Sequence, residues 1–353
     1  MAEVIAVFKL IMAFFMVLPQ ILAPVPAMIA ESTYFEDWSV EQEYTKDYAI
    51  ELEKNPDEDF IILNFADVQL KDQEYYEGMG AESEAMMTKL IEEQQPDLIT
   101  LSGDNAWATV SYINLVEFID GFGIPWAPVM GNHDGQGCIS EFWCAYLFDE
   151  AENCLWKFGP KDMGYGNYII NITENGKVIH TVFMMDTHDD GTWTDENGNE
   201  VSGYDHLWDN QIAWYKWAVE GIAATEGRVV ESTAIMHIPV YEFKTAWETN
   251  YDNELDAFTG EYADGSFGVI HEQPCPGAIN NHFMDTVLEL GSTKNMLFGH
   301  DHVNNASFVY EGVRLSYSLK LGAGCYYEDG LMGGTTYSIA SDGSSVIEHH
   351  FCA

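Results

Sequence analysis

The sequence predicts an α/β fold with a mainly parallel β-sheet and helices packed on it. Three apolar stretches, 60–67, 96–104 and 124–134, have the length and composition of buried strands. Two amphipathic patterns separate them, and in 81–95 the side chains of Met86, Met87, Leu90 and Ile91 fall on one helix face. Strand–helix–strand units of this spacing are typical of parallel sheets.

The later part of the chain also predicts alternating strands and helices, and more of its strands are expected to be antiparallel. Stretches 165–173 and 177–186 flank an Asn-Gly turn and predict a hairpin. Helices are expected over 209–223 and 281–291, strands over 229–240 and 294–302, and antiparallel strands in the tail after 308. Residues 135–165, 190–206 and the acidic region after 240 predict loops, the first as an insertion over the site.

The chain is expected to contain an N-terminal targeting segment and one catalytic domain. In residues 1–30 an apolar run follows Lys9, but Pro19, Pro24 and Pro26 interrupt it too often for a spanning helix. This pattern predicts a signal peptide cleaved near Ala27 or Ala30, and therefore a secreted protein, with an uncleaved anchor as the alternative. An acidic lead-in, 31–58, and a single domain, 59–353, would follow.

Charge and cysteine content narrow the function classes. There are 14 Lys and Arg against 58 Asp and Glu, a formal charge of −44, which repels nucleic-acid backbones and excludes general nucleic-acid binding. This balance is typical of a soluble protein or of adaptation to an ion-rich medium. The 6 cysteines fit an exported chain with up to three disulfides, whose pairing the sequence leaves open.

Polar clusters occur where five of the predicted strands end. They are Asp67-x-Gln69, Asp104-Asn105, Asn132-His133-Asp134, His237 and His300-x-His302. Each alone is weak evidence, but the carboxyl ends of parallel strands open onto one crevice, so the clusters should converge in space. Carboxylate, amide and imidazole ligands without cysteine suit Mn, Fe or Zn in a catalytic rather than a structural site. A bridging Asp104 would hold two such cations about 3.5–4 Å apart, as in phosphoryl displacement.

The order of these clusters resembles the calcineurin-like metallophosphoesterase superfamily. The motifs extend from residue 67 to 302, and the segments 236–243, 299–305 and 315–326 are similar to the branch with the yeast Dcr2-type phosphatases and the plant purple acid phosphatase 29-like proteins. The resemblance implies an αββα sandwich of two mixed β-sheets flanked by helices. It also implies hydrolysis of a small phosphate ester by a water or hydroxide that two divalent or mixed-valence metal ions activate.

The resemblance assigns a role to each clustered residue. The first metal would be held by Asp67, Gln69, Asp104 and His302. The second would be held by Asp104, Asn132, His237 and His300. His133 would protonate the leaving group, Asp134 would orient His133 through a hydrogen bond, and Asn105 would be a second-shell or substrate contact.

Two positions depart from the family pattern. Trp107 stands where purple acid phosphatases have a metal-binding Tyr, and Gln69 offers a neutral amide in place of an imidazole. An amide oxygen is usually the weaker ligand, so the first metal is expected to be labile. One alternative is therefore a non-catalytic or weakly active binding protein that retains the fold. Another is a phosphoprotein phosphatase, which the secretion signal and the negative charge disfavour.

The remaining histidines are not expected to bind metal. Asp186 and His188 match a D-x-H motif but come in the wrong order along the chain, so we place them at the cleft rim. Structural or surface roles are expected for His180, His206, His271, His282, His349 and His350.

Overall fold

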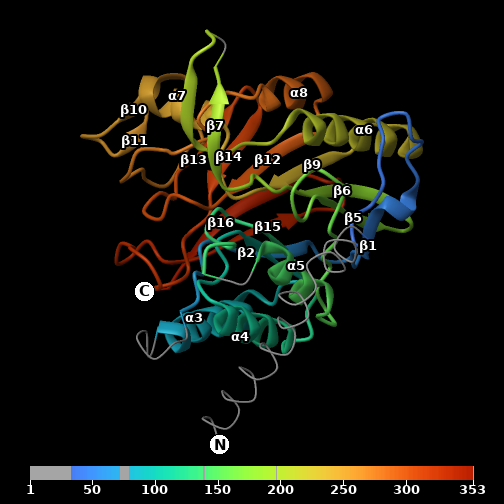
Figure 1. Ribbon diagram of the computed structural model, residues 1–353, viewed down its shortest axis with the longest axis horizontal. Helices are drawn as coiled ribbons and strands as arrows, with labels where there is room; N and C mark the ends of the chain where they lie inside the picture. Colours follow the sequence, from blue (N-terminus) through green and yellow to red (C-terminus); the bar gives the residue numbers. More distant parts are fainter. Residues whose placement is uncertain (1–32, 72–78, 138–139, 196, 353) are drawn as a thin grey trace, which may run out of the picture.

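The computed structural model describes residues 33–71, 79–137, 140–195 and 197–352, to which every structural statement below refers (Figure 1). The expected signal peptide, 1–30, lies outside these residues. Within them no helix combines the length and apolar character needed to cross a bilayer.

Two mixed β-sheets form the centre of the molecule (Figure 1). The first has the order β16-β15-β2-β3-β4, and its strands are β2 (Phe60–Phe65), β3 (Leu98–Ser102), β4 (Trp126–Val129), β15 (Gly333–Ile339) and β16 (Ser345–Phe351). The second has the order β1-β5-β6-β9-β12-β14-β13, with β1 (Ala49–Glu53), β5 (Tyr168–Glu174), β6 (Lys177–Met184), β9 (Glu231–Ile235), β12 (Thr293–Phe298), β13 (Ser307–Tyr310) and β14 (Val313–Tyr317). Strands β2, β3 and β4 are parallel, as are β6, β9, β12 and β14.

Helices cover the outer faces of both sheets. The five-stranded sheet carries α3 (Met79–Gln94), α4 (Thr109–Asp120) and α5 (Glu141–Asp149), and the seven-stranded sheet carries α6 (Asp209–Glu226), α7 (Tyr241–Asn250) and α8 (Phe283–Leu290) (Figure 1). One buried cluster contains side chains of both sheets and of α3 to α5, including Leu101 and Ile170. A second contains the side chains under α6 to α8, including Phe183 and Phe298. The expected αββα sandwich is therefore confirmed.

The predicted strands and helices from 60 to 134 are present, and so is the β5–β6 hairpin around Asn175-Gly176. The lead-in does more than precede the domain, because its strand β1 pairs in parallel with β5 at the edge of the larger sheet. A short 3-10 helix, η1 (Lys46–Tyr48), comes just before β1.

Three segments expected to be loops contain regular structure. Residues 190–206 form the projecting hairpin β7 (Asp190–Thr194) and β8 (Glu200–Tyr204), whose turn is held by Asp195 accepting from the amides of Asn197 and Asn199 (Figure 1). Alternating exposure along β7 shows the period of a strand despite its polar composition.

The other two segments form helices. In α5, Ser140 caps the N-terminus and Trp143, Cys144 and Phe148 are buried. The acidic region after 240 contains α7, where Phe243 packs on Phe298, Phe308 and Tyr317, and then β10 (Tyr251–Asp252), β11 (Ala257–Phe258) and the 3-10 helix η3 (Gly260–Tyr262).

We expect Leu101→Ala to lower the free energy of unfolding by about 2–5 kcal/mol, because it leaves a cavity on β3, an inner strand of the five-stranded sheet. The matched control is Val346→Ala on the edge strand β16, where the side chain is 61% exposed and the change should stay within about 0.5 kcal/mol. Urea unfolding measures both. Equal losses in the two variants would contradict this account of the core.

Candidate metal centre

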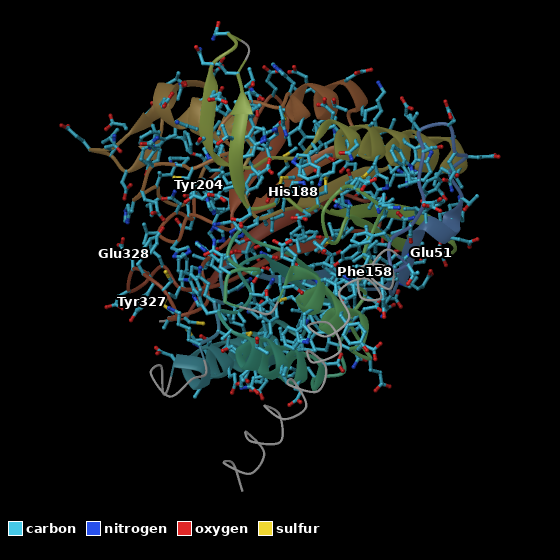
Figure 2. All side chains as sticks on the ribbon, in the orientation of Figure 1. Glu51, Phe158, His188, Tyr204, Tyr327 and Glu328 are labelled. Atoms are coloured by element: carbon cyan, nitrogen blue, oxygen red, sulfur yellow. The ribbon has the colours of Figure 1, made fainter. Side chains whose placement is uncertain are left out.

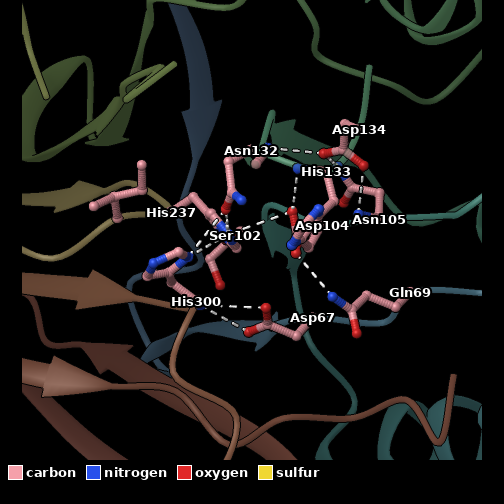
Figure 3. A network of polar contacts seen from close by, with 12 residues as sticks. Asp67, Gln69, Ser102, Asp104, Asn105, Asn132, His133, Asp134, His237 and His300 are labelled. Atoms are coloured by element: carbon pink, nitrogen blue, oxygen red, sulfur yellow. Dashed lines mark hydrogen bonds and ion pairs between the residues drawn. The ribbon is translucent and has the colours of Figure 1, made fainter. Parts of the chain in front are cut away.

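The five polar clusters meet at one edge of the sandwich, where strands of both sheets end (Figure 3). The first sheet contributes the residues after β2, β3 and β4, namely Asp67, Gln69, Asp104, Asn132 and His133. The second contributes the residues after β9 and β12, namely His237, His300 and His302. All but His133 are buried. The expected convergence is confirmed.

The backbone at this edge is turned tightly. Asp67, Gln69, Asp104 and His300 all have positive φ, between 42° and 78°, in the left-handed region that L-residues rarely adopt. A Cβ on Gly131 would lie 2.3 Å from the Asp104 amide nitrogen, so only glycine permits this close approach. Backbone strain of this kind is typical of functional sites that the surrounding structure holds in place.

The proposed ligands of the second metal lie at coordination spacing. Asn132 Oδ1 is 3.0 Å from both His237 Nε2 and His300 Nδ1, and these two nitrogens are 3.3 Å apart. Asp104 Oδ1 completes the group at 3.4 Å from His237 Nε2 (Figure 3). Such separations are those between neighbouring ligands of an ion with bonds of about 2.0–2.2 Å.

Hydrogen bonding makes this group suited to a cation. His237 Nδ1 lies 2.9 Å from the carbonyl oxygen of Ser102, which only accepts, so Nδ1 carries the proton of the neutral ring. The lone pair of Nε2 then faces the amide oxygen of Asn132 and the carboxylate of Asp104. A carboxylate oxygen, an amide oxygen and two imidazole nitrogens at this spacing fit a metal ion, and these residues therefore match the implied second site.

Burial and the neighbouring charges shift the pKa values of two of these histidines and of Asp67. Burial disfavours the charged form of His237, but the carboxylates of Asp104 and Asp67 raise its pKa overall. Burial and the nearby charge of His237 hold the pKa of His300 well below its ordinary value. Burial would raise the pKa of Asp67, but the bond to His302 and the charges of His302, His237 and Lys320 lower it overall.

The proposed ligands of the first metal are also close together. His302 Nδ1 donates to the carbonyl oxygen of Tyr326 at 3.0 Å, which leaves Nε2 facing Asp67 Oδ1 at 3.4 Å. Gln69, however, presents its amide nitrogen here: Nε2 donates to Asp104 Oδ2 at 2.8 Å and lies 3.3 Å from His302 Nε2. The set thus matches the implied site except at Gln69.

Lys320 is the main residue of the site that the sequence analysis missed. It follows β14 and is buried, and its Nζ donates to Gln69 Oε1 at 3.0 Å and to the carbonyl oxygen of Asp67 at 2.8 Å. Burial lowers the pKa of Lys320 to about 8, against the opposing charges of Asp67, Cys325 and Asp104. The available signal was a lysine among apolar and glycine residues in a chain that has few basic residues.

The prediction that Asp134 orients His133 through a hydrogen bond is wrong. Asp134 is buried and accepts from the backbone and side-chain amides of Asn105 at 2.7 and 2.8 Å and from Gly131 N at 2.7 Å. The ring of His133 points to the rim, where Nδ1 lies 2.8 Å from Gln136 Oε1. Adjacent residues of this turn face opposite ways, so Asp134 anchors the loop and Gln136 orients the histidine.

Asn105 belongs to the support of the site, as expected. Its side-chain amide donates to the carbonyl oxygen of Val129 and to Asp134, which ties the loop after β3 to β4. Burial and the charge of Asp104 raise the pKa of Asp134 to about 7.

Aromatic rings border the donor group. The ring of Trp107 lies 4.9 Å from that of His133. Tyr204 meets His300 edge-on at 4.3 Å, and Tyr326 stacks on His302 at 4.2 Å. Figure 2 places Tyr204 at the base of the projecting β7–β8 hairpin. The rim is therefore largely aromatic, and residues far apart in sequence supply it.

Asp186 and His188 have structural contacts. Asp186 accepts from the amides of Tyr165 and His188 at 2.7 and 2.8 Å, and the His188 ring stacks on Trp208 at 3.8 Å while its Nε2 meets Gln211 Oε1 at 2.8 Å. They hold the loop after β6.

The cysteine count allows up to three disulfides, but a three-disulfide framework is not formed. Such a framework would use all 6 cysteines, but Cys154, Cys275, Cys325 and Cys352 are free thiols. Cys138 lies outside the described residues.

A two-sheet sandwich with this ligand group at its carboxyl edge defines a metallophosphoesterase. The family model for calcineurin-like phosphoesterases matches residues 60–304, and the chain belongs to that family. The structure of a dimetal phosphatase from Danio rerio superimposes with a TM-score of 0.51 at 12% identity, covering 82% of this chain and 95% of that one. This likeness supports the fold.

The chain also resembles proteins from plants and yeast. "Probable inactive purple acid phosphatase 14" and "Probable inactive purple acid phosphatase 29" of Arabidopsis thaliana are 26% and 24% identical to it, over 70% and 69% of this chain and 63% and 64% of theirs. "Phosphatase DCR2" of Saccharomyces cerevisiae is 24% identical over 63% of this chain and 39% of its own. The chain thus spans less than two thirds of the length of these relatives.

Gly131→Ala should weaken Mn²⁺ binding about 10–100-fold, because the added methyl group must displace the Asp104 backbone or carboxylate. Gly123→Ala is the control: its methyl group enters open space, and the strain of its positive φ of 67° falls before the start of β4, at the other end of that strand from Asn132. Calorimetric titration of each folded variant with Mn²⁺ measures the affinity. Unchanged affinity in Gly131→Ala would contradict the geometry described here.

Proposed function

We propose that this protein is a secreted, metal-dependent hydrolase of small phosphate esters. The observation that carries the proposal is the group formed by Asp104, Asn132, His237 and His300, whose ligand-type atoms lie 3.0 to 3.4 Å from one another. Membership of the calcineurin-like phosphoesterase family supports the reaction class. The pattern of residues 1–30 supports secretion, and the charge of −44 disfavours nucleic acids as partners.

Asp104, Asn132, His237 and His300 would hold one divalent ion, and Asp67 and His302 would contribute to a second. An ion in such a site supplies Lewis acidity that polarises a phosphoryl oxygen and brings the pKa of water to about 7. The hydrogen bond from His237 Nδ1 to the carbonyl oxygen of Ser102 would hold the ring in the orientation that turns Nε2 toward this ion.

His133 is the proposed proton donor to the leaving group. Its backbone amide donates to Asp104 Oδ1 at 2.9 Å, which places the residue beside the ligand group. Its Nδ1 is engaged by Gln136, so Nε2 is the nitrogen available to exchange a proton with substrate. The ring of Trp107 packs beside the imidazole and limits its rotation.

A second candidate function is a non-catalytic binding protein. The amide nitrogen that Gln69 presents toward Asp104 and His302 favours it, because that atom cannot ligate a metal. The complete second ligand group and the position of His133 favour an enzyme.

Hydrolysis of an aryl phosphate monoester and of a diaryl phosphate, each with Mn²⁺ and with EDTA, tests the proposal. We expect turnover of at least one ester with Mn²⁺ and its loss in EDTA. If neither ester is hydrolysed by protein shown to contain Mn²⁺, the binding-protein alternative replaces the enzyme.

Replacement of His133 by Ala should lower kcat about 10²–10⁴-fold and leave Mn²⁺ affinity unchanged, because the side chain moves a proton and is no ligand. His350→Ala is the control, since His350 lies on the edge strand β16 and its ring meets the hydroxyl of Thr336 there. Steady-state kinetics and calorimetry measure the two quantities. A His133→Ala enzyme with full activity would remove His133 from the reaction.

A further inference from the structure

We infer that Lys320 fixes Gln69 in an orientation that excludes it as a metal ligand, so that the chain holds one metal ion tightly and the first position is weak. This inference rests on the metal site of the proposed function and adds a residue that controls how many ions the site holds. It concerns metal content and not the reaction itself.

The side chain of Lys320 is 2% exposed and reaches the back of the proposed first position. Its ammonium group meets two oxygens, the carbonyl of Asp67 at 2.8 Å and Gln69 Oε1 at 3.0 Å. An ammonium group has three donors and no acceptor. The Gln69 amide must therefore turn its oxygen toward Lys320.

This orientation turns the amide nitrogen of Gln69 toward the other proposed ligands. Its Nε2 donates to Asp104 Oδ2 at 2.8 Å and lies 3.3 Å from His302 Nε2. An N–H donor thus stands where the first site needs an oxygen. The contact satisfies Asp104 Oδ2 by hydrogen bonding instead of by metal coordination.

For Gln69 to ligate a cation, its amide would have to rotate by half a turn. The –NH₂ group would then face the ammonium of Lys320, donor against donor, and the charge-assisted bond to Oε1 would be lost. The arriving cation would also be close to a buried positive charge. These costs should weaken the first position at least about tenfold relative to a site without Lys320.

At the second position, no lysine or arginine among the described residues holds the amide oxygen of Asn132 away from the metal site. Asn132 turns its oxygen toward the two histidines, and the proton on His237 Nδ1 is fixed by Ser102 on the far side of the ring. The two metal positions therefore differ in what the amide oxygen meets. The oxygen of Gln69 accepts from the ammonium group of Lys320, whereas the oxygen of Asn132 faces the imidazoles of the ligand group.

The test is metal content of the full chain after loading with Mn²⁺ and removal of unbound ions by gel filtration. Elemental analysis should find one Mn per wild-type chain, and electron paramagnetic resonance should show isolated ions without exchange coupling. Lys320→Met removes the ammonium and keeps the length of the side chain, so Gln69 can rotate. This variant should hold two ions with exchange coupling, and its second Mn²⁺ should bind at least about tenfold more tightly.

Lys54→Met is the matched control. Lys54 is also buried, but its ammonium pairs with Glu174 at 2.8 Å and Ser341 at 2.9 Å, on a different part of the molecule from the metal ligands. Its variant should keep the wild-type content of one ion.

Two exchange-coupled ions in the wild-type chain would overturn the inference, and this measurement stands even if Lys320→Met does not fold. A folded Lys320→Met that still holds one ion would overturn it as well. Turnover in the same samples separates the two proposals. One ion without hydrolysis supports the inference and removes the proposed function, whereas two coupled ions with hydrolysis do the reverse.

Discussion

Asp104 lies at the end of β3 with its carboxylate buried between the two sheets, and its contacts come from three other segments of the chain. Oδ1 accepts from the backbone of His133 at 2.9 Å and lies 3.4 Å from His237 Nε2, and Oδ2 accepts from Gln69 at 2.8 Å. A buried carboxylate is costly unless charged or polar partners surround it. The loops after β2, β4 and β9 are therefore constrained to approach this one group.

The fold makes that approach possible at the expense of local backbone strain. Parallel strands of both sheets end at the same edge, and positive φ at Asp67, Gln69, Asp104 and His300 turns the chain sharply there. The buried loop contacts of Asp134 with Asn105 and Gly131 hold one of these turns. Rigidity of this kind keeps ligands at coordination spacing before any ion arrives, which reduces the ordering that binding requires.

Much of this arrangement could be predicted from sequence, because it depends on local patterns. The strand–helix alternation predicts the sandwich core, and ligand-type residues at five strand ends predict one metal edge. The features that could not be predicted from the sequence depend on contacts between distant segments or on local side-chain directions. The pairing of Lys320 with Gln69 joins residues separated by 251 positions. The role of Asp134 depends on which way each residue of a tight turn points, and the β7–β8 hairpin is stabilised by its turn in spite of a polar composition.

The central claim is that a metal ion binds between Asp104, Asn132, His237 and His300. Anomalous X-ray scattering from crystals of the Mn²⁺-loaded protein tests it most directly. We expect the strongest peak within about 2.0–2.2 Å of ligand atoms from all four residues. Crystals in which these side chains are ordered and Mn²⁺ is bound elsewhere or not at all would contradict this metal site.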